Sequence, residues 1–186
     1  MSLLETERLL IRNWQESDRD LFHRINSDDQ VMTFFPFRRN RAEADAVMDR
    51  FSKEISELGY GFAAMECRDS REVIGFTGIR QVNGLPSLPT GSHEIGWRLV
   101  PEAWGKGYAT EAASAWLEFA FHGLKLSEIF SYAVHDNHAS LAVMRRIGMV
   151  ELTDQAFDHP LVPDSHPELK RHRLFRLSAE EWEAGR

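Results

Sequence analysis

The stretch that decides the fold of this 186-residue chain is Glu94-Ile-Gly-Trp-Arg-Leu-Val-Pro-Glu-Ala-Trp-Gly-Lys-Gly-Tyr-Ala-Thr-Glu-Ala112. It opens with a strand, predicted over residues 93–100, and continues through a turn that contains two glycines. After the turn, apolar residues recur at three- and four-residue spacing, which is typical of a helix with one buried face. These residues are Ala109, Ala112, Ala113, Trp116, Leu117, Ala120 and Phe121. The sequence therefore predicts a strand, a glycine turn and a helix in that order.

The glycine turn has the features of an anion-binding site. The first backbone N–H groups of a helix lack intrahelical acceptors and lie at the positive end of the helix dipole, which favours a phosphate. Gly105 and Gly107 permit close approach because they carry no Cβ, and Lys106 adds a positive charge. Tight packing of the turn is an alternative that these residues leave open. The glycine spacings typical of ordinary ATP and NAD sites are missing from the sequence.

Further elements are predicted on both sides of this stretch. Before it come a strand (6–14), a helix beginning near Ser17, a second helix (40–58) and two strands (60–68 and 72–81) joined by a short polar turn. After it come a buried strand (129–134), a helix (139–147) that ends at Gly148, and a last strand (173–177). Antiparallel strands followed by alternating strands and helices indicate an α/β or mixed α+β fold.

Composition narrows the function. The length favours a single domain over residues 1–186, and the net charge of −7 makes nucleic acid an improbable partner and mildly favours cationic substrates. The start of the chain does not resemble a signal peptide, and no run of 18 apolar residues occurs, so we expect a cytoplasmic protein without a membrane span. His135 and His138 lack the partners of a metal site, so no metal is expected.

Two motifs resemble the GNAT N-acetyltransferases, and in particular their RimJ/RimL-like branch. The first is Trp104-Gly-Lys-Gly-Tyr-Ala-Thr-Glu-Ala112. The second follows at the expected distance, as Asn137-His-Ala-Ser140 and then Val143-Met-Arg-Arg-Ile-Gly-Met149. The likeness extends from Thr6-Glu-Arg-Leu9 to the final strand, residues 172–177, and therefore covers nearly the whole chain.

The resemblance implies an acyl-CoA N-acyltransferase fold, in which a mostly antiparallel, splayed central sheet is flanked by helices, and it implies acetyl-CoA as cosubstrate. The pantetheine arm would bind Leu99 and Val100, and the diphosphate would bind the glycine turn. The full set of expected coenzyme-binding residues is Leu99, Val100, Trp104, Gly105, Lys106, Gly107, Tyr108, Ala109, Thr110, Asn137 and Ser140. Trp104 departs from the Gln or Arg that often begins this turn in the superfamily, although tryptophan is usual in the branch.

Two residues are candidates for proton transfer. An amine acceptor is mostly protonated at neutral pH and must lose a proton before it attacks. Glu94 is the candidate base if it shares a strand face with Gly96 and Arg98; the alternative is a surface glutamate. Ser140 is the candidate acid, because Met144 stands where many superfamily members have a tyrosine; the alternative is a contact at the start of the helix. A backbone amide near Val100 is expected to stabilise the thioester oxygen.

The sequence does not determine which amine accepts the acetyl group. Residues 157–167 are predicted to form a long loop, which we place over the acceptor side. The opposite wall is expected from Phe34, Phe35, Pro36 and Phe37, for which simple packing in the core is the alternative. The favoured function is acetylation of a primary amine, on either a protein N-terminus or a small molecule, by a monomer or homodimer. The alternative is a regulatory module that binds acyl-CoA without turnover.

Overall fold

The computed structural model describes residues 2–185, which group into two compact units. The first contains the chain up to Arg80 together with Gly96–Trp116. The second contains Gln81–Ile95 and the chain from Leu117 onward. Strand β5 (His93–Leu99) contributes residues to both units, because its first three residues belong to the second unit and its last four to the first.

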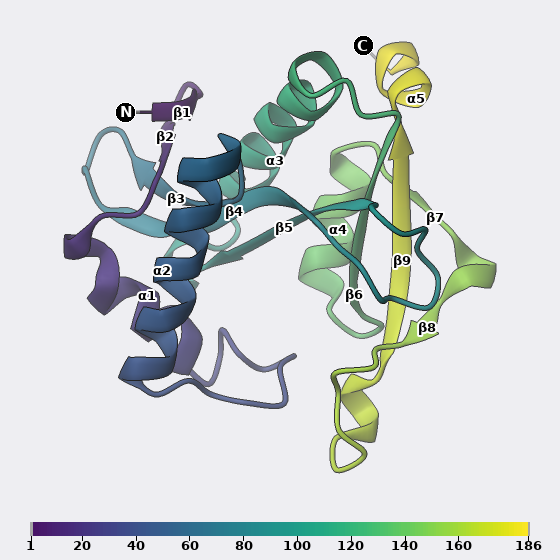
Figure 1. Cartoon of the computed structure of the whole chain (residues 1–186), viewed down its shortest axis with the longest axis horizontal. Helices are drawn as coiled ribbons and strands as arrows, with labels where there is room; N and C mark the ends of the chain where they lie inside the picture. Colours follow the sequence, from purple (N-terminus) through teal and green to yellow (C-terminus); the bar gives the residue numbers. More distant parts are fainter. Residues whose placement is uncertain (1, 186) are drawn as a thin grey trace. The chain divides into compact units, whose positions relative to one another are not determined.

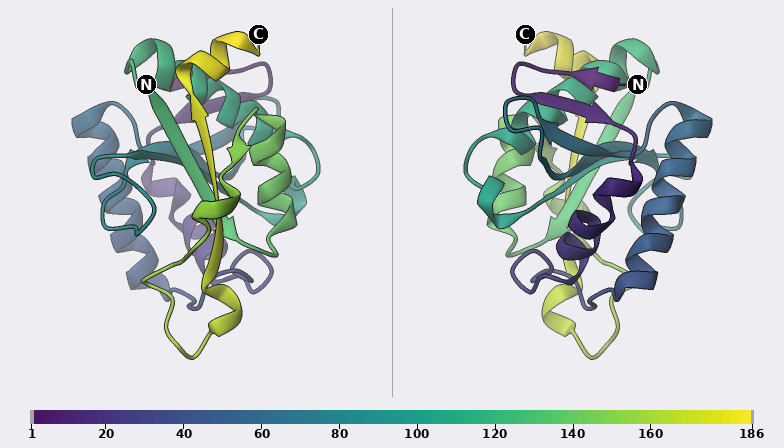
Figure 2. Two further views of the ribbon diagram at one scale, coloured as in Figure 1. Left: turned by 90° about the vertical axis from the view of Figure 1, so that its right-hand side faces the viewer. Right: turned by 90° about the vertical axis from the view of Figure 1, so that its left-hand side faces the viewer.

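The first unit is built on antiparallel strands (Figure 1). Its strands run in the order β1-β2-β3-β4-β5, and Leu9 of β2 is paired with Cys67 of β3. Helices α1 and α2 lie side by side, and α2 packs against β3 (Figures 1 and 2). The elements that begin in this unit, besides β5, are β1 (Ser2–Glu5), β2 (Leu9–Arg12), α1 (Arg19–Ser27), α2 (Arg41–Leu58), β3 (Phe62–Cys67), β4 (Val73–Gln81) and α3 (Tyr108–Glu118).

Local sequence explains where α2 begins and ends. The side chain of Asn40 accepts the N–H of Glu43, and the Glu43 carboxylate accepts the N–H of Asn40, which satisfies two donors at the helix start. The helix ends at Gly59, whose φ of +79° suits a residue without a Cβ. The inner face of α2 carries Phe51, whose ring meets those of Phe22 and Phe76 at 5.9 and 5.8 Å. Aromatic packing of this kind forms the core of the first unit.

The second unit is organised around β9. This strand pairs antiparallel with β6 along the whole length of β6, from Glu128↔Ser178 to Val134↔His172, while β7 and β8 also pair with β9. Figure 2 shows the two long strands beside each other. Glu94 of β5 pairs with Phe130 of β6 in parallel. The elements that begin in this unit, besides β5, are a π-helical turn (Phe119–Gly123), β6 (Glu128–Val134), α4 (His138–Arg146), β7 (Val150–Glu151), β8 (Phe157–Asp158), β9 (Arg171–Ser178) and α5 (Ala179–Ala184).

The predicted fold class is confirmed: the sheet is mixed and mostly antiparallel, and helices flank it. The elements missed from sequence are β1, β7, β8 and α5, which are two to six residues long. The strand predicted over residues 6–14 is shorter, because Thr6 donates its N–H to the Leu9 carbonyl in a turn that reverses the chain between β1 and β2. Among the described residues, no helix has both the length and the apolar character that a membrane crossing needs.

Candidate functional site

The glycine turn forms as the sequence predicts, at the start of α3. Residues Pro101–Ala103 make a 3-10 turn, and α3 begins at Tyr108. Between them Gly105 and Gly107 have φ values of +72° and +83°, in the left-handed region that favours glycine. Residues 104–107 are exposed to solvent, so their backbone is accessible.

The backbone N–H groups of residues 105–110 have no hydrogen-bond acceptor within the part of the chain that the structure describes. Just before them, the Trp104 N–H donates to the Pro101 carbonyl at 3.1 Å; just after them, the Glu111 N–H donates to the Gly107 carbonyl at 3.0 Å. Six consecutive donors therefore remain available at the positive end of the helix dipole. Such a run of amides, with glycines that leave the backbone uncovered, suits a phosphate or diphosphate.

The end of β5 meets this turn through Trp104. Its indole N–H donates to the Leu99 carbonyl at 2.9 Å, so the tryptophan ties the turn to the strand. The backbone of Val100 is already hydrogen-bonded. Its N–H donates to the Ile74 carbonyl at 3.0 Å, and its carbonyl accepts the Ala103 N–H at 3.0 Å. The Val100 N–H itself is therefore used by the sheet, and stabilisation of a thioester oxygen by a backbone amide near Val100 stays a prediction.

Hydrogen bonds around Glu111 connect the β1–β2 hairpin to the glycine turn and to the start of α3. The Glu111 carboxylate accepts hydrogen bonds from the Thr6 hydroxyl at 2.5 Å, the Arg8 N–H at 2.9 Å and the Arg8 Nε at 2.6 Å. Arg8 also donates from Nη1 to the Lys106 carbonyl at 3.0 Å and lies over the Tyr108 ring at 4.6 Å. In the sequence, the motif Thr6-Glu-Arg-Leu9 indicated only the resemblance to the family. In the structure, its Thr and Arg side chains bind Glu111, and the Arg side chain also binds the backbone of the glycine turn.

Asn137 and Ser140 lie in the second unit, at the start of α4. The Asn137 side chain caps the helix by accepting the Ser140 N–H at 3.2 Å. This contact uses the backbone of Ser140, and the Ser140 hydroxyl has no partner among residues 2–185. Met144, at the position where many superfamily members have tyrosine, is buried with 1% of its surface exposed. A hydroxyl is therefore available at Ser140, and the buried thioether at Met144 has no proton to donate.

Glu94 lies in the second unit as well, near the start of β5. It is buried, and the strand is continuous to Leu99, so Glu94, Gly96 and Arg98 share one face of β5 as the prediction required. At Gly96 this face lies against the Phe62 ring, because a Cβ added there would be 3.3 Å from two atoms of that ring. The shared face is observed, and the role of Glu94 as a base stays a prediction.

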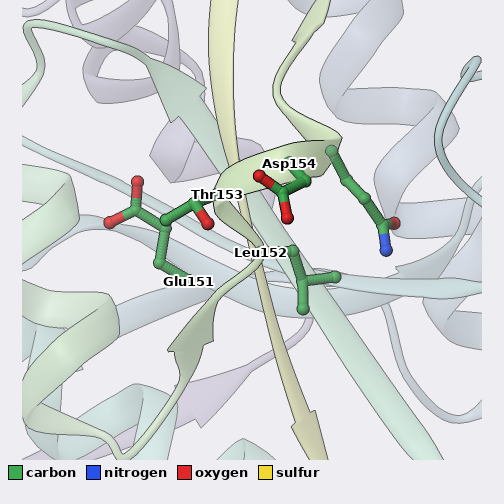
Figure 3. A pocket seen from close by; sticks show the side chains of 5 residues that line it. Glu151, Leu152, Thr153 and Asp154 are labelled. Carbon is green, nitrogen blue, oxygen red and sulfur yellow. The ribbon is translucent and has the colours of Figure 1, made fainter.

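Among residues 2–185, no group of three or more His, Cys, Asp or Glu side chains is arranged to hold a metal ion. A pocket of about 230 Å³ lies beside β7 in the second unit, lined by Glu151, Leu152, Thr153, Asp154 and Gln155 (Figure 3). The Glu151 carboxylate is already bound by Arg173 at 2.6 Å, and none of the predicted site residues lines this pocket.

Comparison with known proteins identifies the family. A family model described as an acetyltransferase (GNAT) domain matches residues 8–150. The chain belongs to the GNAT acetyltransferase family. The uncharacterized N-acetyltransferase YnaD of Bacillus subtilis is 32% identical over 149 residues, which cover 78% of this chain and 81% of YnaD. A GNAT-family acetyltransferase of Bacillus anthracis has a crystal structure that shares the fold, with a TM-score of 0.77, 24% identity, and coverage of 95% of this chain and 98% of that one. The spermidine N-acetyltransferase of Vibrio cholerae, solved with CoA and spermine, shares the fold with a TM-score of 0.73 and 17% identity over 96% and 99% of the two chains.

This GNAT protein is accordingly an acetyl-CoA-dependent acetyltransferase. The residues at the start of α3 fit that cosubstrate, because its diphosphate needs several convergent donors and the six amides of residues 105–110 supply them. Acetyl-CoA brings an acyl group activated as a thioester. The protein supplies binding, orientation and the movement of protons.

Proposed function

We propose that this enzyme transfers the acetyl group of acetyl-CoA to a primary amine, in the manner of the RimJ/RimL-like branch. The acceptor is a small-molecule amine or a protein N-terminus. The observation that carries the proposal is the run of six amides without acceptors, at residues 105–110, in a chain whose family uses acetyl-CoA. In this proposal the diphosphate binds these amides and Lys106, and the pantetheine arm follows β5 at Leu99.

The acceptor amine must be neutral to attack, because the reference pKa of a lysine-type amine is near 10.4 and that of an α-amine is near 8. Glu94 takes the proton, directly or through water, and its place on the same strand face as Gly96 supports this role. The departing thiolate accepts a hydrogen bond from the Ser140 hydroxyl, which has no partner among residues 2–185, and takes a proton through that hydroxyl as Ser140 regains one from solvent water. Asn137 supports the proposal by fixing the start of α4, the turn on which Ser140 lies.

Lys106 offers a direct test of the coenzyme site. In Lys106→Glu an exposed cation on the turn becomes an anion, so the Kd for coenzyme A should rise roughly tenfold or more through loss of a charge-assisted contact and gain of repulsion. Lys53→Glu makes the same charge change on the exposed face of α2 and should leave the Kd unaltered. Equal effects of the two substitutions, measured by calorimetry, would remove the diphosphate from this turn.

The specific observation behind a second candidate function is the buried Met144, which replaces the tyrosine acid of many relatives and would suit a module that binds acyl-CoA without turnover. Release of free thiol from acetyl-CoA, measured with polyamine, amino-acid and peptide acceptors, separates the two. Amine-dependent release supports the enzyme. Tight coenzyme binding with no release for any acceptor would favour the binding module.

A further inference from the structure

Two arginines of the first unit share one neutral hydrogen-bond acceptor. Arg98 of β5 donates from Nη1 to the Asn26 side-chain oxygen at 2.7 Å, and Arg39, in the segment between α1 and α2, donates to the same oxygen at 2.8 Å. Asn26 is 1% exposed, and its amide nitrogen donates to the Phe22 carbonyl at 2.7 Å, which fixes the direction of the oxygen. The two guanidinium groups are therefore neighbours, held together at the end of α1.

Aromatic rings position both guanidinium groups. Arg98 lies over the Phe35 ring at 4.1 Å and near the Phe76 ring at 5.3 Å. Arg39 lies over the Phe37 ring at 4.4 Å, and the Phe35 and Phe37 rings are 6.0 Å apart. Rings that face a guanidinium stabilise its charge but leave its N–H groups, which lie in the guanidinium plane, free to bind an anion. Phe35 and Phe37, two of the residues expected to form a wall for the acceptor, thus lie against these two arginines.

Neither arginine has a carboxylate within ion-pair distance among residues 2–185. Neighbouring arginines are paired: Arg38 with Asp29 at 2.9 Å, and Arg41 with Asp45 at 3.0 Å. The acid that attracts Arg39 from further away, Glu43, is bound to the backbone at the start of α2.

Their surroundings make the lack of a counter-ion costly. Burial lowers the pKa of Arg98 to about 9, and the positive charge of Arg39 adds to this; burial also lowers the pKa of Arg39. Both residues nevertheless keep some exposed surface. Each guanidinium has five N–H donors, of which the structure pairs one with a side-chain acceptor. Two half-buried cations with unused donors and no acid beside them form an arrangement that an added oxyanion would complete.

We propose that Arg39 and Arg98 bind the carboxylate of the acceptor, so that the substrate is a small, amino-acid-like amine. Arg98 directly precedes Leu99, so the carboxylate would be held on the strand assigned to the pantetheine arm. The inference rests on the proposed function and narrows it. The net charge of −7 mildly favoured cationic substrates, whereas this site is positively charged and would attract an anion. The two descriptions agree because Arg39 and Arg98 have no carboxylate within ion-pair distance among residues 2–185.

The test compares acids with matched amides that lack the charge. Thiol release from acetyl-CoA is measured with L-phenylalanine, L-alanine, β-alanine and γ-aminobutyrate, with the carboxamide of each, and with spermidine. The spacing between amine and carboxylate varies across the acids, so the set does not presuppose one geometry. We expect at least one acid to exceed its carboxamide in kcat/KM by about 10- to 100-fold, the range for charge-assisted pairing. Acids that are no better than their carboxamides at every spacing would overturn the proposal.

Variants then assign the preference to these arginines. Arg98→Gln and Arg39→Gln should each bring the ratio of acid to carboxamide close to one. Arg41→Gln removes the same charge two residues from Arg39, on a guanidinium already paired with acids, and should leave the ratio as in the wild type. Because the ratio is measured within one protein sample, a smaller folded fraction does not change it. A preference that survives in both Arg98→Gln and Arg39→Gln would refute the assignment.

Failure of the proposed function gives a different result from failure of this inference. Turnover of spermidine or of carboxamides, without a preference for acids, keeps the enzyme and removes the carboxylate site. If no acceptor is turned over, the proposed function fails, and calorimetry with the protein saturated by coenzyme A decides the inference. Binding of an acid but not of its carboxamide, lost in Arg98→Gln, supports the site. Equal or undetectable binding of both rules it out.

Discussion

Replacing Glu111 with glutamine tests whether contacts from the β1–β2 hairpin keep the glycine turn in the conformation that we propose binds coenzyme A. Glutamine keeps the size and the helix propensity of glutamate but has one acceptor oxygen, and its amide group would face the donors of Arg8. The ion pair with Arg8 contributes little by itself, because the Arg8 side chain is 41% exposed and solvent screens it. The Thr6 hydroxyl and the Arg8 N–H donate to Oε1 of the Glu111 carboxylate, and Arg8 Nε donates to Oε2. Glutamine has one oxygen for these three donors, so at least one of them faces the glutamine amide nitrogen and loses its acceptor, which costs about 1 to 3 kcal/mol.

We therefore expect the free energy of unfolding of Glu111→Gln to fall by about 2 kcal/mol. Arg8 also holds the Lys106 carbonyl, so the turn loses a restraint and must be ordered when the ligand binds. The Kd for coenzyme A should then rise about tenfold, which corresponds to about 1.4 kcal/mol. Urea unfolding measures the first quantity and calorimetry the second. Glu118→Gln, the same change on the exposed last turn of α3, is the control and should leave coenzyme affinity unaltered.

The stability difference depends on pH in a defined direction. Burial favours the neutral form of Glu111, but hydrogen bonds from Thr6 and Arg8 outweigh it, and the pKa of Glu111 is lowered. A carboxyl with a lowered folded pKa stabilises the protein above its unfolded pKa, near 4.3, and loses this contribution as the pH falls through the folded value. The difference between wild type and variant should be full at pH 7 and should shrink below about pH 4. Lost stability with unchanged coenzyme affinity would refute the link to the turn, and unchanged stability would refute the hydrogen-bond reasoning itself.

Three further substitutions test other parts of the molecule. Ser140→Ala should lower kcat by roughly 100-fold and lower coenzyme affinity much less, the pattern of a group that acts mainly in the transition state; steady-state kinetics that show unaltered kcat would exclude the role. Arg12→Gln should lower the free energy of unfolding by about 3 to 5 kcal/mol in urea, because the buried carboxylate of Asp18 loses its ion pair and that of Glu66 keeps only the exposed Arg71; a loss under 1 kcal/mol would contradict this. Burial lowers the pKa of His159 to about 4, so stability is full above its unfolded pKa, near 6.5, and falls by at most about 3 kcal/mol toward pH 4. His159→Phe should flatten that decline in unfolding experiments across the same pH range, and an identical slope would assign it to other groups.

Segments with a regular apolar spacing, or with capping residues and glycines at their ends, were predictable from sequence. The helix α2 follows from its apolar spacing, its capping Asn40 and its terminating Gly59, all of which are local signals. The glycine turn was predictable for the same reason, because the conformations of Gly105 and Gly107 depend on the backbone of a few residues. The two-residue strands β7 and β8 have no periodicity to detect, and they exist because β9 offers them a partner.

The candidate site divides in the same way. The free amides of the glycine turn follow from local chain geometry. The Val100 N–H, by contrast, is hydrogen-bonded because the neighbouring strand places the Ile74 carbonyl beside it. The Glu111 carboxylate meets Thr6 and Arg8 more than 100 residues away in sequence, and no local pattern marks such a contact. Resemblance to relatives indicated that Thr6-Glu-Arg-Leu9 matters and did not indicate why.

From sequence alone the fold class, the glycine turn and most helices and strands were predictable, because spacing and backbone preference act over short distances along the chain. The family was indicated by the resemblance of two motifs to known acetyltransferases. The tie between Glu111 and the N-terminal hairpin, the occupied amide of Val100 and the pairing of Arg39 with Arg98 on Asn26 were decided only in three dimensions. Whether a charge or a donor is satisfied depends on which distant groups the folded chain brings within a few ångströms, and that information is not contained in any single segment.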